Sequence, residues 1–249
     1  MTRRELCDLL APAAGEEAEI EAKFLLESSR DEAWLRQAVQ RRLLGEPLQY
    51  ILGEWEFMGL PFFVGPGALI PRQDTETLCE AALTWLKTRP DARILDLCCG
   101  TGCVGVSLSK LGGAQAAFAD ISPEALALAQ RNAARNGVDG AFYESDLFSN
   151  VPGVYDLIAC NPPYLTGAEM ESCQRELTFE PALALYGGED GLDFYRRLAD
   201  EWEAHVTPGG RLLMEIGYAQ GAAVQGLFPG ATILKDIRGL DRVAWVEKV

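Results

Sequence analysis

The amino-acid sequence predicts an α/β fold, with a mostly parallel β-sheet covered by helices on both faces and a small helical segment before it. The main observation is that strand-like apolar runs alternate with helix-like amphipathic segments over the last two thirds of the chain. A second observation is the length of 249 residues, which suits one large domain plus a small one. A third is the content of 48% hydrophobic and 24% charged residues, which is ordinary for a globular chain.

Helical periodicity characterises the first part of the chain. Residues 16–28 place Ile20, Phe24 and Leu25 on one helix face. An amphipathic helix of this kind packs its apolar stripe on a neighbour and leaves its other face in solvent. We therefore expect the acidic run Glu16–Glu21 to be solvated.

A second helix and a hairpin are predicted to follow. Residues Ser29–Glu32 have the Ser-x-x-Glu form of a capping box, which predicts a helix start. Further on, Glu54–Met58 alternates in polarity, and the apolar run Pro61–Val64 follows a glycine, as in a β-hairpin. We therefore predict a helical domain over residues 1–45 and a linker with a hairpin over 46–70.

Residues 71–249 are predicted to form the main domain. An N-cap at Asp74 is expected to open its first helix. Helices are predicted over 74–88, 103–110, 122–136 and 190–204, and strands over 93–97, 115–119, 140–144, 154–160, 210–216, 231–236 and 242–247. Ligands of such sheets bind at the carboxyl ends of the strands, so the residues that follow each strand are the candidates for a site.

The first candidate is the turn Asp96–Gly102, which ends the first predicted strand of the sheet and opens a helix. Its glycines allow a ligand to approach the backbone, and the helix N-terminus favours an anionic group. Gly100, Gly102 and Gly105 also match the G-x-G-x-x-G of dinucleotide sites, which keeps a nicotinamide cofactor as an alternative. A carboxylate at Asp96 would repel a pyrophosphate, however, and it suits a ligand with a cationic centre such as S-adenosylmethionine.

Two further acids follow the next strands. Asp120 ends the second strand, where an acid can accept hydrogen bonds from both ribose hydroxyls, although it could also simply cap the next helix. Asp146 and Leu147 follow the third strand, where the edge of an adenine would lie. Asp146 could accept a hydrogen bond from the exocyclic amine, and Leu147 could pack on the ring.

The third candidate is Asn161-Pro162-Pro163-Tyr164, directly after a strand. The prolines fix the backbone and leave the Asn161 side-chain oxygen and the Pro162 carbonyl as directed acceptors. Two acceptors match the two hydrogens of a planar NH₂ group, and the Tyr164 ring offers a face for stacking on that plane. The alternative is a rigid turn with a capping asparagine.

These motifs together resemble the class I S-adenosylmethionine-dependent methyltransferases that modify planar amino groups, which have a Rossmann-like, doubly wound seven-stranded sheet. Nearly the whole chain further resembles the bacterial peptide chain release factor N5-glutamine methyltransferases. That resemblance is carried by Gly45–Gly53, Phe57, Ile70–Glu76, Glu180-Pro181, Gly187–Leu192, Glu215–Gly217 and Asp241–Val243. The chain departs from the family pattern at Cys98, Cys99 and Gln73.

The resemblance implies transfer of a methyl group from S-adenosylmethionine to the amide nitrogen of the glutamine in the Gly-Gly-Gln motif of class 1 release factors. It implies a catalytic and substrate-binding role for Asn161, Pro162, Pro163 and Tyr164. It implies cofactor contacts by Asp96, Cys98, Cys99, Gly100, Thr101, Gly102, Asp120, Ile121, Asp146, Leu147 and Asn161. It makes Phe57 a candidate wall of the cofactor pocket and segment 1–45 a substrate-docking domain.

Composition separates the remaining alternatives. The formal net charge of −15 disfavours a nucleic-acid amino-methyltransferase, because phosphate binding requires a basic face. The Asn-Pro-Pro-Tyr motif also leaves open a methyltransferase acting on a glutamine of a ribosomal protein. One histidine, His205, and seven cysteines without a Cys-x-x-Cys pair argue against a metal site. We expect a cytoplasmic enzyme without a membrane span, and we interpret His205 as a structural helix-end residue.

Overall fold

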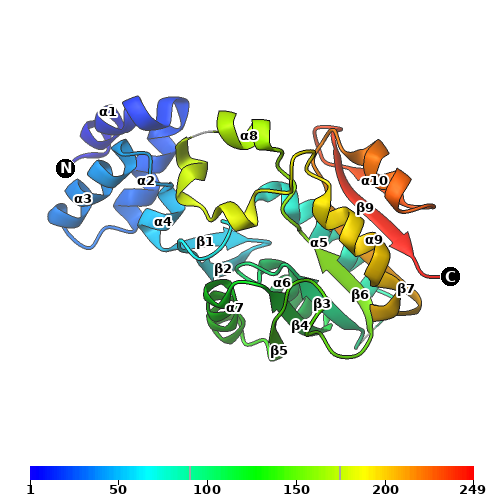
Figure 1. Cartoon of the computed structure of the whole chain (residues 1–249). Coiled ribbons are helices and arrows are strands. Elements are labelled where there is room, and N and C mark those ends of the chain that lie inside the picture. The colour runs from blue at the N-terminus through cyan, green and yellow to red at the C-terminus, as the bar shows by residue number, and fades with distance from the viewer. Residues whose placement is uncertain (90, 174) are drawn as a thin grey trace.

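The computed structural model describes residues 1–89, 91–173 and 175–249. Helices at the N-terminal end lie beside an α/β body whose sheet carries helices on both faces (Figure 1). A segment that includes helix α8 (Gly167–Ser172) runs between the N-terminal helices and the sheet (Figure 1). The predicted fold class is confirmed.

Four α-helices form the N-terminal part: α1 (Arg3–Ala14), α2 (Ala18–Glu27), α3 (Glu32–Leu43) and α4 (Leu48–Leu52). A 3₁₀ turn, η1 (Gly15–Glu17), joins the first two. Their common core contains Leu6, Leu10, Leu25 and Leu35. Ile20 was expected in this core, but it is 59% exposed, because the buried face of α2 is formed by Ala18, Ala22 and Leu25.

Two further predictions for this part are wrong. The side chain that caps α3 is Asp31, which accepts a hydrogen bond from the Trp34 N–H at 2.7 Å, and the predicted capping box at Ser29 is not formed. Glu21 is not solvated, because its carboxylate is buried against Arg42 at 2.8 Å. The charge pattern of one helix could not reveal this partner, which lies on another helix.

The predicted hairpin is present as β1 (Glu54–Phe57) and β2 (Leu60–Phe63). It docks on α7 (Pro123–Asn136) through the buried side chain of Asn132. The Asn132 Oδ1 accepts from the Phe63 N–H at 2.7 Å, and Nδ2 donates to the Phe63 carbonyl at 3.0 Å. The side-chain amide of Asn132 thus pairs with the Phe63 backbone as a neighbouring strand would, and it holds the hairpin against the α/β body.

Seven described strands form the main sheet in the order β5-β4-β3-β6-β7-β9-β8. They are β3 (Arg93–Leu97), β4 (Gln115–Asp120), β5 (Gly140–Glu144), β6 (Tyr155–Cys160), β7 (Val206–Glu215), β8 (Thr232–Lys235) and β9 (Asp241–Glu247). The first five are parallel, and β9 pairs antiparallel with both β7 and β8. The chain reverses its direction of winding between β3 and β6, where a ligand site is expected.

Helices cover both faces of this sheet. Helices α5 (Gln73–Leu86), α6 (Cys103–Gly112) and α7 share one core cluster with Ile94 and Phe118. Helices α9 (Asp193–His205) and α10 (Gly221–Leu227) share the other with Leu95 and Ile158. Ile94 and Leu95 are adjacent in β3, so the period-two alternation of a strand assigns them to opposite cores.

Some boundaries and elements differ from those predicted. Helix α5 begins at Gln73 after Arg72, and Asp74 does not cap it but pairs with Arg238 and Arg242 from the β8–β9 end of the sheet. The sequence predicts no separate element for helices α1, α4, α8 and α10 or for the 3₁₀ turns η2 (Arg175–Phe179) and η3 (Ala182–Ala184). Apart from α1, which lies inside the predicted helical domain, these elements are short.

Candidate active site

The glycine turn after β3 adopts a strained backbone that only tertiary packing explains. Cys98, Gly100 and Gly102 all have positive φ, at 57°, 52° and 76°. A Cβ atom on Gly102 would lie 3.0 Å from the Cβ of Ala129, and one on Gly105 would lie 2.5 Å from the Phe118 ring. Two glycines of the G-x-G-x-x-G pattern therefore serve the packing of α6 and α7, and Gly100 alone of the three lines the cavity described below.

Asp96 is the buried acid of this turn. Its side chain is 2% exposed and accepts a hydrogen bond from the Gly105 N–H at 2.7 Å. Burial raises the pKa of Asp96 well above its ordinary range, against the effect of the Gly105 N–H. An unpaired buried carboxylate is costly, and a cationic ligand next to it would relieve that cost.

Asp120 is fixed by two backbone donors at the end of β4. Its Oδ2 accepts from the Gly100 N–H at 2.8 Å, and its Oδ1 accepts from the Ser122 N–H at 2.9 Å. Burial raises the pKa of Asp120, and these N–H groups partly oppose the rise. Each oxygen of an ionised carboxylate has two acceptor positions, so Asp120 can still accept from two hydroxyl groups.

A cavity of about 310 Å³ lies over these residues at the carboxyl ends of β3, β4 and β6. Most of the residues predicted to bind the cofactor line it, namely Asp96, Cys98, Cys99, Gly100, Thr101, Asp120, Ile121, Asp146, Leu147 and Asn161. Gly102 and Pro162 are not among its lining residues, whereas Pro163 is. Asp146 also pairs with Arg197 at 2.8 Å, so its carboxylate is already engaged on one side.

The cavity suits a nucleoside that carries a cationic group. It has an acid at the position expected for a ribose, an apolar side chain at Leu147, and a buried acid with a raised pKa at Asp96. Its volume is within the usual range for ligand sites. The residues present therefore fit S-adenosylmethionine better than a dinucleotide, whose pyrophosphate would face Asp96.

A second hollow of about 150 Å³ adjoins the first, and four residues line both: Leu69, Arg72, Asn161 and Ala184. Its remaining walls are Tyr164, Leu165, Leu177 and Leu185. Because Asn161 faces both spaces, a group bound in the smaller hollow would meet one bound in the larger cavity at this side chain.

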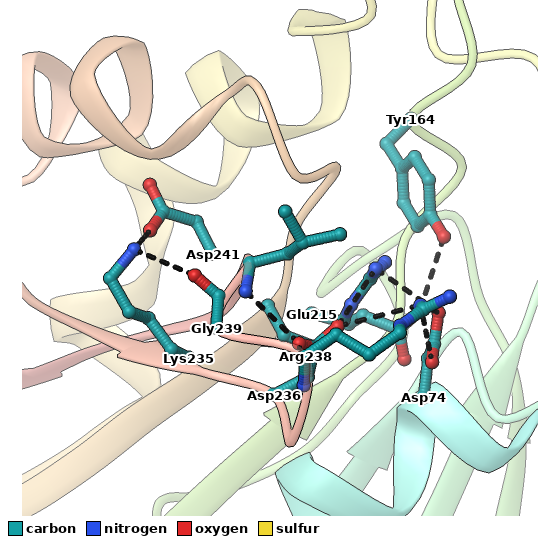
Figure 2. A network of polar contacts seen from close by, with 10 residues as sticks. Asp74, Tyr164, Glu215, Lys235, Asp236, Arg238, Gly239 and Asp241 are labelled. Carbon is teal, nitrogen blue, oxygen red and sulfur yellow. Dashed lines mark hydrogen bonds and ion pairs between the residues drawn. The ribbon is translucent and has the colours of Figure 1, made fainter.

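The predicted Asn161–Tyr164 segment is held by contacts that its own sequence does not specify. The Asn161 Nδ2 donates to the Thr75 Oγ1 at 3.3 Å. The Tyr164 hydroxyl donates to the Glu215 Oε1 at 3.2 Å, as Figure 2 shows. Burial raises the pKa of Tyr164, and the neighbouring Glu215 charge adds to the rise. The amide and the ring are therefore both anchored in the protein.

Several site residues were missed by motif reasoning. Arg72 forms an ion pair with Glu180, and the Glu180 Oε2 accepts from the Ile70 N–H at 2.8 Å. The ion pair thus joins the start of α5 to the segment after η2. Thr75 and Arg72 lie within the segment Ile70–Glu76 and were cited only for the family resemblance. Their spacing predicts a helix start and gives no sign of a site.

Two further candidate side chains, Phe57 and His205, pack against aromatic rings and do not line the cavity. Phe57 does not line the cavity as expected, because it is 2% exposed and packs edge-on against Phe62 at 6.2 Å. His205 is the last residue of α9 and stacks on Phe148 at 4.3 Å, in agreement with its interpretation as a structural residue.

The part of the chain that the structure describes contains no group of three or more His, Cys, Asp or Glu side chains arranged to hold a metal ion. Among those same residues, no helix combines the length and the apolar character that crossing a bilayer requires.

Comparison with known folds and families defines the class. Residues 74–185 match the family "Methyltransferase small domain", and residues 28–53 match the family "PrmC N-terminal domain". A methyltransferase from Pyrococcus furiosus has a similar fold, with a TM-score of 0.57, 18% identity and coverage of 77% of this chain and 90% of that one. A 16S rRNA methyltransferase from T. thermophilus, solved with AdoMet and guanosine, gives a TM-score of 0.58 at 19% identity, over 79% of this chain and 50% of that one. The fold is therefore that of the class I methyltransferases.

Curated relatives define the family within that class. The chain is 44% identical to the release factor glutamine methyltransferase of Geobacter sulfurreducens, over 84% of this chain and 75% of the relative. It is 45% identical to that of Cereibacter sphaeroides, over 83% and 76%. Identity to the Bordetella pertussis enzyme is 40%, over 88% and 84%. The chain belongs to the release factor glutamine methyltransferase family.

Proposed function

We propose that this enzyme transfers a methyl group from S-adenosylmethionine to the side-chain amide nitrogen, N5, of the glutamine in the Gly-Gly-Gln motif of class 1 peptide chain release factors. The observation that carries this proposal is the position of Asn161 between a nucleoside-sized cavity and a smaller hollow. The activity of the curated relatives supports the same substrate.

The larger cavity is the cofactor site in this proposal. Asp120 would accept hydrogen bonds from the ribose hydroxyls, Leu147 would pack on the adenine, and Asp96 would hold the cationic end of the ligand. S-adenosylmethionine, when bound, supplies a methyl group on a sulfonium, which is already reactive towards nucleophiles. Cys98 and Cys99 replace residues that are usual in the family, and they line the cavity without closing it.

The smaller hollow is the glutamine site. An amide nitrogen is a poor nucleophile, because its lone pair is delocalised into the carbonyl group. The Asn161 Oδ1 accepts a hydrogen bond from the substrate NH₂ and aims its nitrogen at the methyl group, whereas Pro162, the second predicted acceptor, is not a wall of this hollow. The Asn161 oxygen also stabilises the positive charge that develops on the nitrogen. The Tyr164 ring confines the amide plane.

No dedicated general base is needed in this scheme, since an attacked amide nitrogen becomes strongly acidic and water can take its proton. Most of the acceleration is then attributable to proximity and orientation of the two substrates. The mechanism therefore depends on how rigidly Asn161 and its neighbours are held.

The remaining parts of the molecule have roles consistent with a protein substrate. We assign docking of the release factor to the helical domain 1–45, joined through the linker 46–70 to a catalytic domain over 71–249. Release factors act in translation, so the enzyme is expected to work in the cytoplasm. The net charge of −15 argues against direct binding of nucleic acid or of an anionic membrane surface.

Mass spectrometry tests the proposal directly. Purified class 1 release factor is incubated with the enzyme and labelled S-adenosylmethionine, and its tryptic peptides are sequenced. One added methyl group on the glutamine of Gly-Gly-Gln is expected. Ribosomal proteins and an adenine-containing DNA duplex, tested in parallel, are expected to stay unmodified. Methylation of either one with an unmodified release factor would reject the proposal.

A further inference from the structure

Asn161 presents its amide to the site in only one productive orientation. The substrate NH₂ requires an acceptor, so the Oδ1 atom must face the hollow and the Nδ2 atom must face the protein. The Nδ2 atom is satisfied by the Thr75 Oγ1 at 3.3 Å. Thr75 is 2% exposed and lies in the first turn of α5. A rotated Asn161 would lose this hydrogen bond, so Thr75 favours the productive orientation.

The Thr75 hydroxyl needs a partner of its own. Its oxygen accepts from Asn161, which leaves its proton free to be donated, and the Glu215 carboxylate at the end of β7 is near enough for the Thr75 hydroxyl to lower its pKa. Within residues 1–89, 91–173 and 175–249, the Glu215 Oε2 is buried and has no hydrogen-bond partner. It is therefore available to the Thr75 hydroxyl. The Oε1 atom of the same carboxylate accepts from Tyr164.

Glu215 is held in an ion network at the β7–β9 edge. It is 1% exposed, and burial raises its pKa, while the Thr75 hydroxyl, the Arg242 charge and the Tyr164 hydroxyl oppose that rise. Arg242 is buried and pairs with Asp74 at 3.1 Å and Asp236 at 3.4 Å. Figure 2 shows Tyr164, Glu215 and Asp74 together in this network. A cation beside Glu215 favours its carboxylate form, which can only accept hydrogen bonds.

We propose that Glu215 and Thr75 are positioning residues that set the orientation of the Asn161 amide. The carboxylate accepts from Thr75, Thr75 accepts from Asn161, and the Asn161 oxygen is left to accept from the substrate. A group that donates a hydrogen bond becomes a better acceptor itself, so donation from the Asn161 NH₂ to Thr75 also makes the Asn161 oxygen a better acceptor. The same carboxylate anchors Tyr164, and one residue thus fixes both side chains around the substrate amide. This inference rests on the proposed function.

Substitutions in Thr75 and Glu215 test the inference. Thr75→Val removes the hydroxyl and keeps the shape, Thr75→Ser keeps the hydroxyl, and Glu215→Gln removes the obligate acceptor. Tyr195→Phe is the matched control, because the buried Tyr195 hydroxyl donates to the backbone carbonyl of Glu215 at 2.8 Å and leaves its carboxylate untouched. Single-turnover methylation of class 1 release factor is measured at saturating S-adenosylmethionine, with the Kd for S-adenosylmethionine and the melting temperature of each variant.

Thr75→Val and Glu215→Gln are expected to slow single turnover on the order of 10-fold to 100-fold, as for a misplaced catalytic group, with little change in cofactor affinity. Thr75→Ser and Tyr195→Phe are expected to keep rates near that of the parent. In an Asn161→Ala background, Thr75→Val should hardly lower the single-turnover rate further, because Asn161, the residue through which Thr75 acts, is gone.

Three results would overturn the inference while leaving the proposed function intact. The first is a parent-like rate for Thr75→Val or Glu215→Gln. The second is an equal loss for Thr75→Ser and Thr75→Val. The third is an undiminished effect of Thr75→Val in the Asn161→Ala background. A parent enzyme that fails to methylate release factor at all would instead overturn the proposed function, and this inference with it.

Discussion

Asn161 is the residue on which the proposed chemistry depends most directly. Its substitution by alanine removes a preorganised acceptor whose interaction strengthens as the substrate nitrogen becomes cationic. We expect Asn161→Ala to lower the single-turnover rate by about 10²–10³-fold and to change the Kd for S-adenosylmethionine far less. Rapid-quench kinetics and calorimetry measure the two quantities. A rate within a few-fold of the parent would mean that the Asn-Pro-Pro-Tyr segment is only a turn.

Asp120 should give the site a defined pH dependence. In the proposed function its ionised form accepts hydrogen bonds from the ribose hydroxyls, and burial raises its pKa, so it gains a proton at a higher pH than an ordinary aspartate. S-adenosylmethionine binding should therefore weaken as the pH falls from about 7 to about 5. In Asp120→Asn, which cannot ionise, affinity should be lower and its dependence on pH smaller.

Calorimetric titrations over this pH range check the expectation. Asp146→Asn is a suitable control, since this carboxylate also lines the cavity but is 47% exposed at its side chain. The role of Asp120 would be refuted if Asp120→Asn kept both the affinity and the pH dependence of the parent.

At the scale of elements, the N-terminal helices are joined to the active-site segment by one buried ion cluster. Arg42 on α3 pairs with Glu21 on α2 at 2.8 Å and with Glu176 in η2 at 2.5 Å. Both Arg42 and Glu21 are buried. The segment that contains Glu176 continues to Glu180, which pairs with Arg72 beside the smaller hollow. The cluster therefore connects the predicted docking domain with the wall of the smaller hollow.

Substitution of Arg42 should lower the free energy of unfolding much more than substitution of a surface arginine of the same helix. Arg42→Ala leaves Glu21 buried without its partner, which typically costs about 3–5 kcal/mol. Arg36→Ala breaks a pair with Glu32 whose side chains are 69% and 58% exposed, and it should cost roughly 0.5 kcal/mol or less. Urea denaturation at a constant m-value measures both. Similar midpoints for the two variants would show that the cluster contributes no more than a surface pair.

At the scale of the whole molecule, the cofactor cavity is built by the ends of β3, β4 and β6 together with the segment that follows the Asn161 turn. A ligand that binds there stabilises the folded state by mass action. At about 100 times its Kd, S-adenosylmethionine should add about 2.7 kcal/mol. For a chain of this size, that corresponds to a rise in melting temperature of roughly 5–10 °C.

Scanning calorimetry with each ligand in turn checks this expectation. NAD at the same concentration should leave the melting temperature unchanged, because its pyrophosphate would face Asp96. The reverse pattern, with NAD stabilising and S-adenosylmethionine inert, would favour the dinucleotide interpretation of the glycine turn.

The sequence by itself determined the features that are encoded locally. Alternating periodicities predicted all seven strands of the sheet, and turn chemistry identified the glycine turn and the Asn161–Tyr164 segment. The strand ends also predicted which polar side chains would meet, because parallel strands bring their carboxyl ends to one edge. Asp96, Asp120 and Asn161 indeed line one cavity.

Tertiary structure alone decided which side chains hold these motifs in place. Thr75 lies 86 residues before Asn161, and Glu215 lies 51 residues after Tyr164. The acidic run of α2 contains one carboxylate that is buried, and only the approach of α3 selects Glu21. Periodicity and turn chemistry act over a few residues and can be read from the chain. The partner of a buried polar group depends on strand order and helix packing, which bring distant residues together without leaving a local pattern.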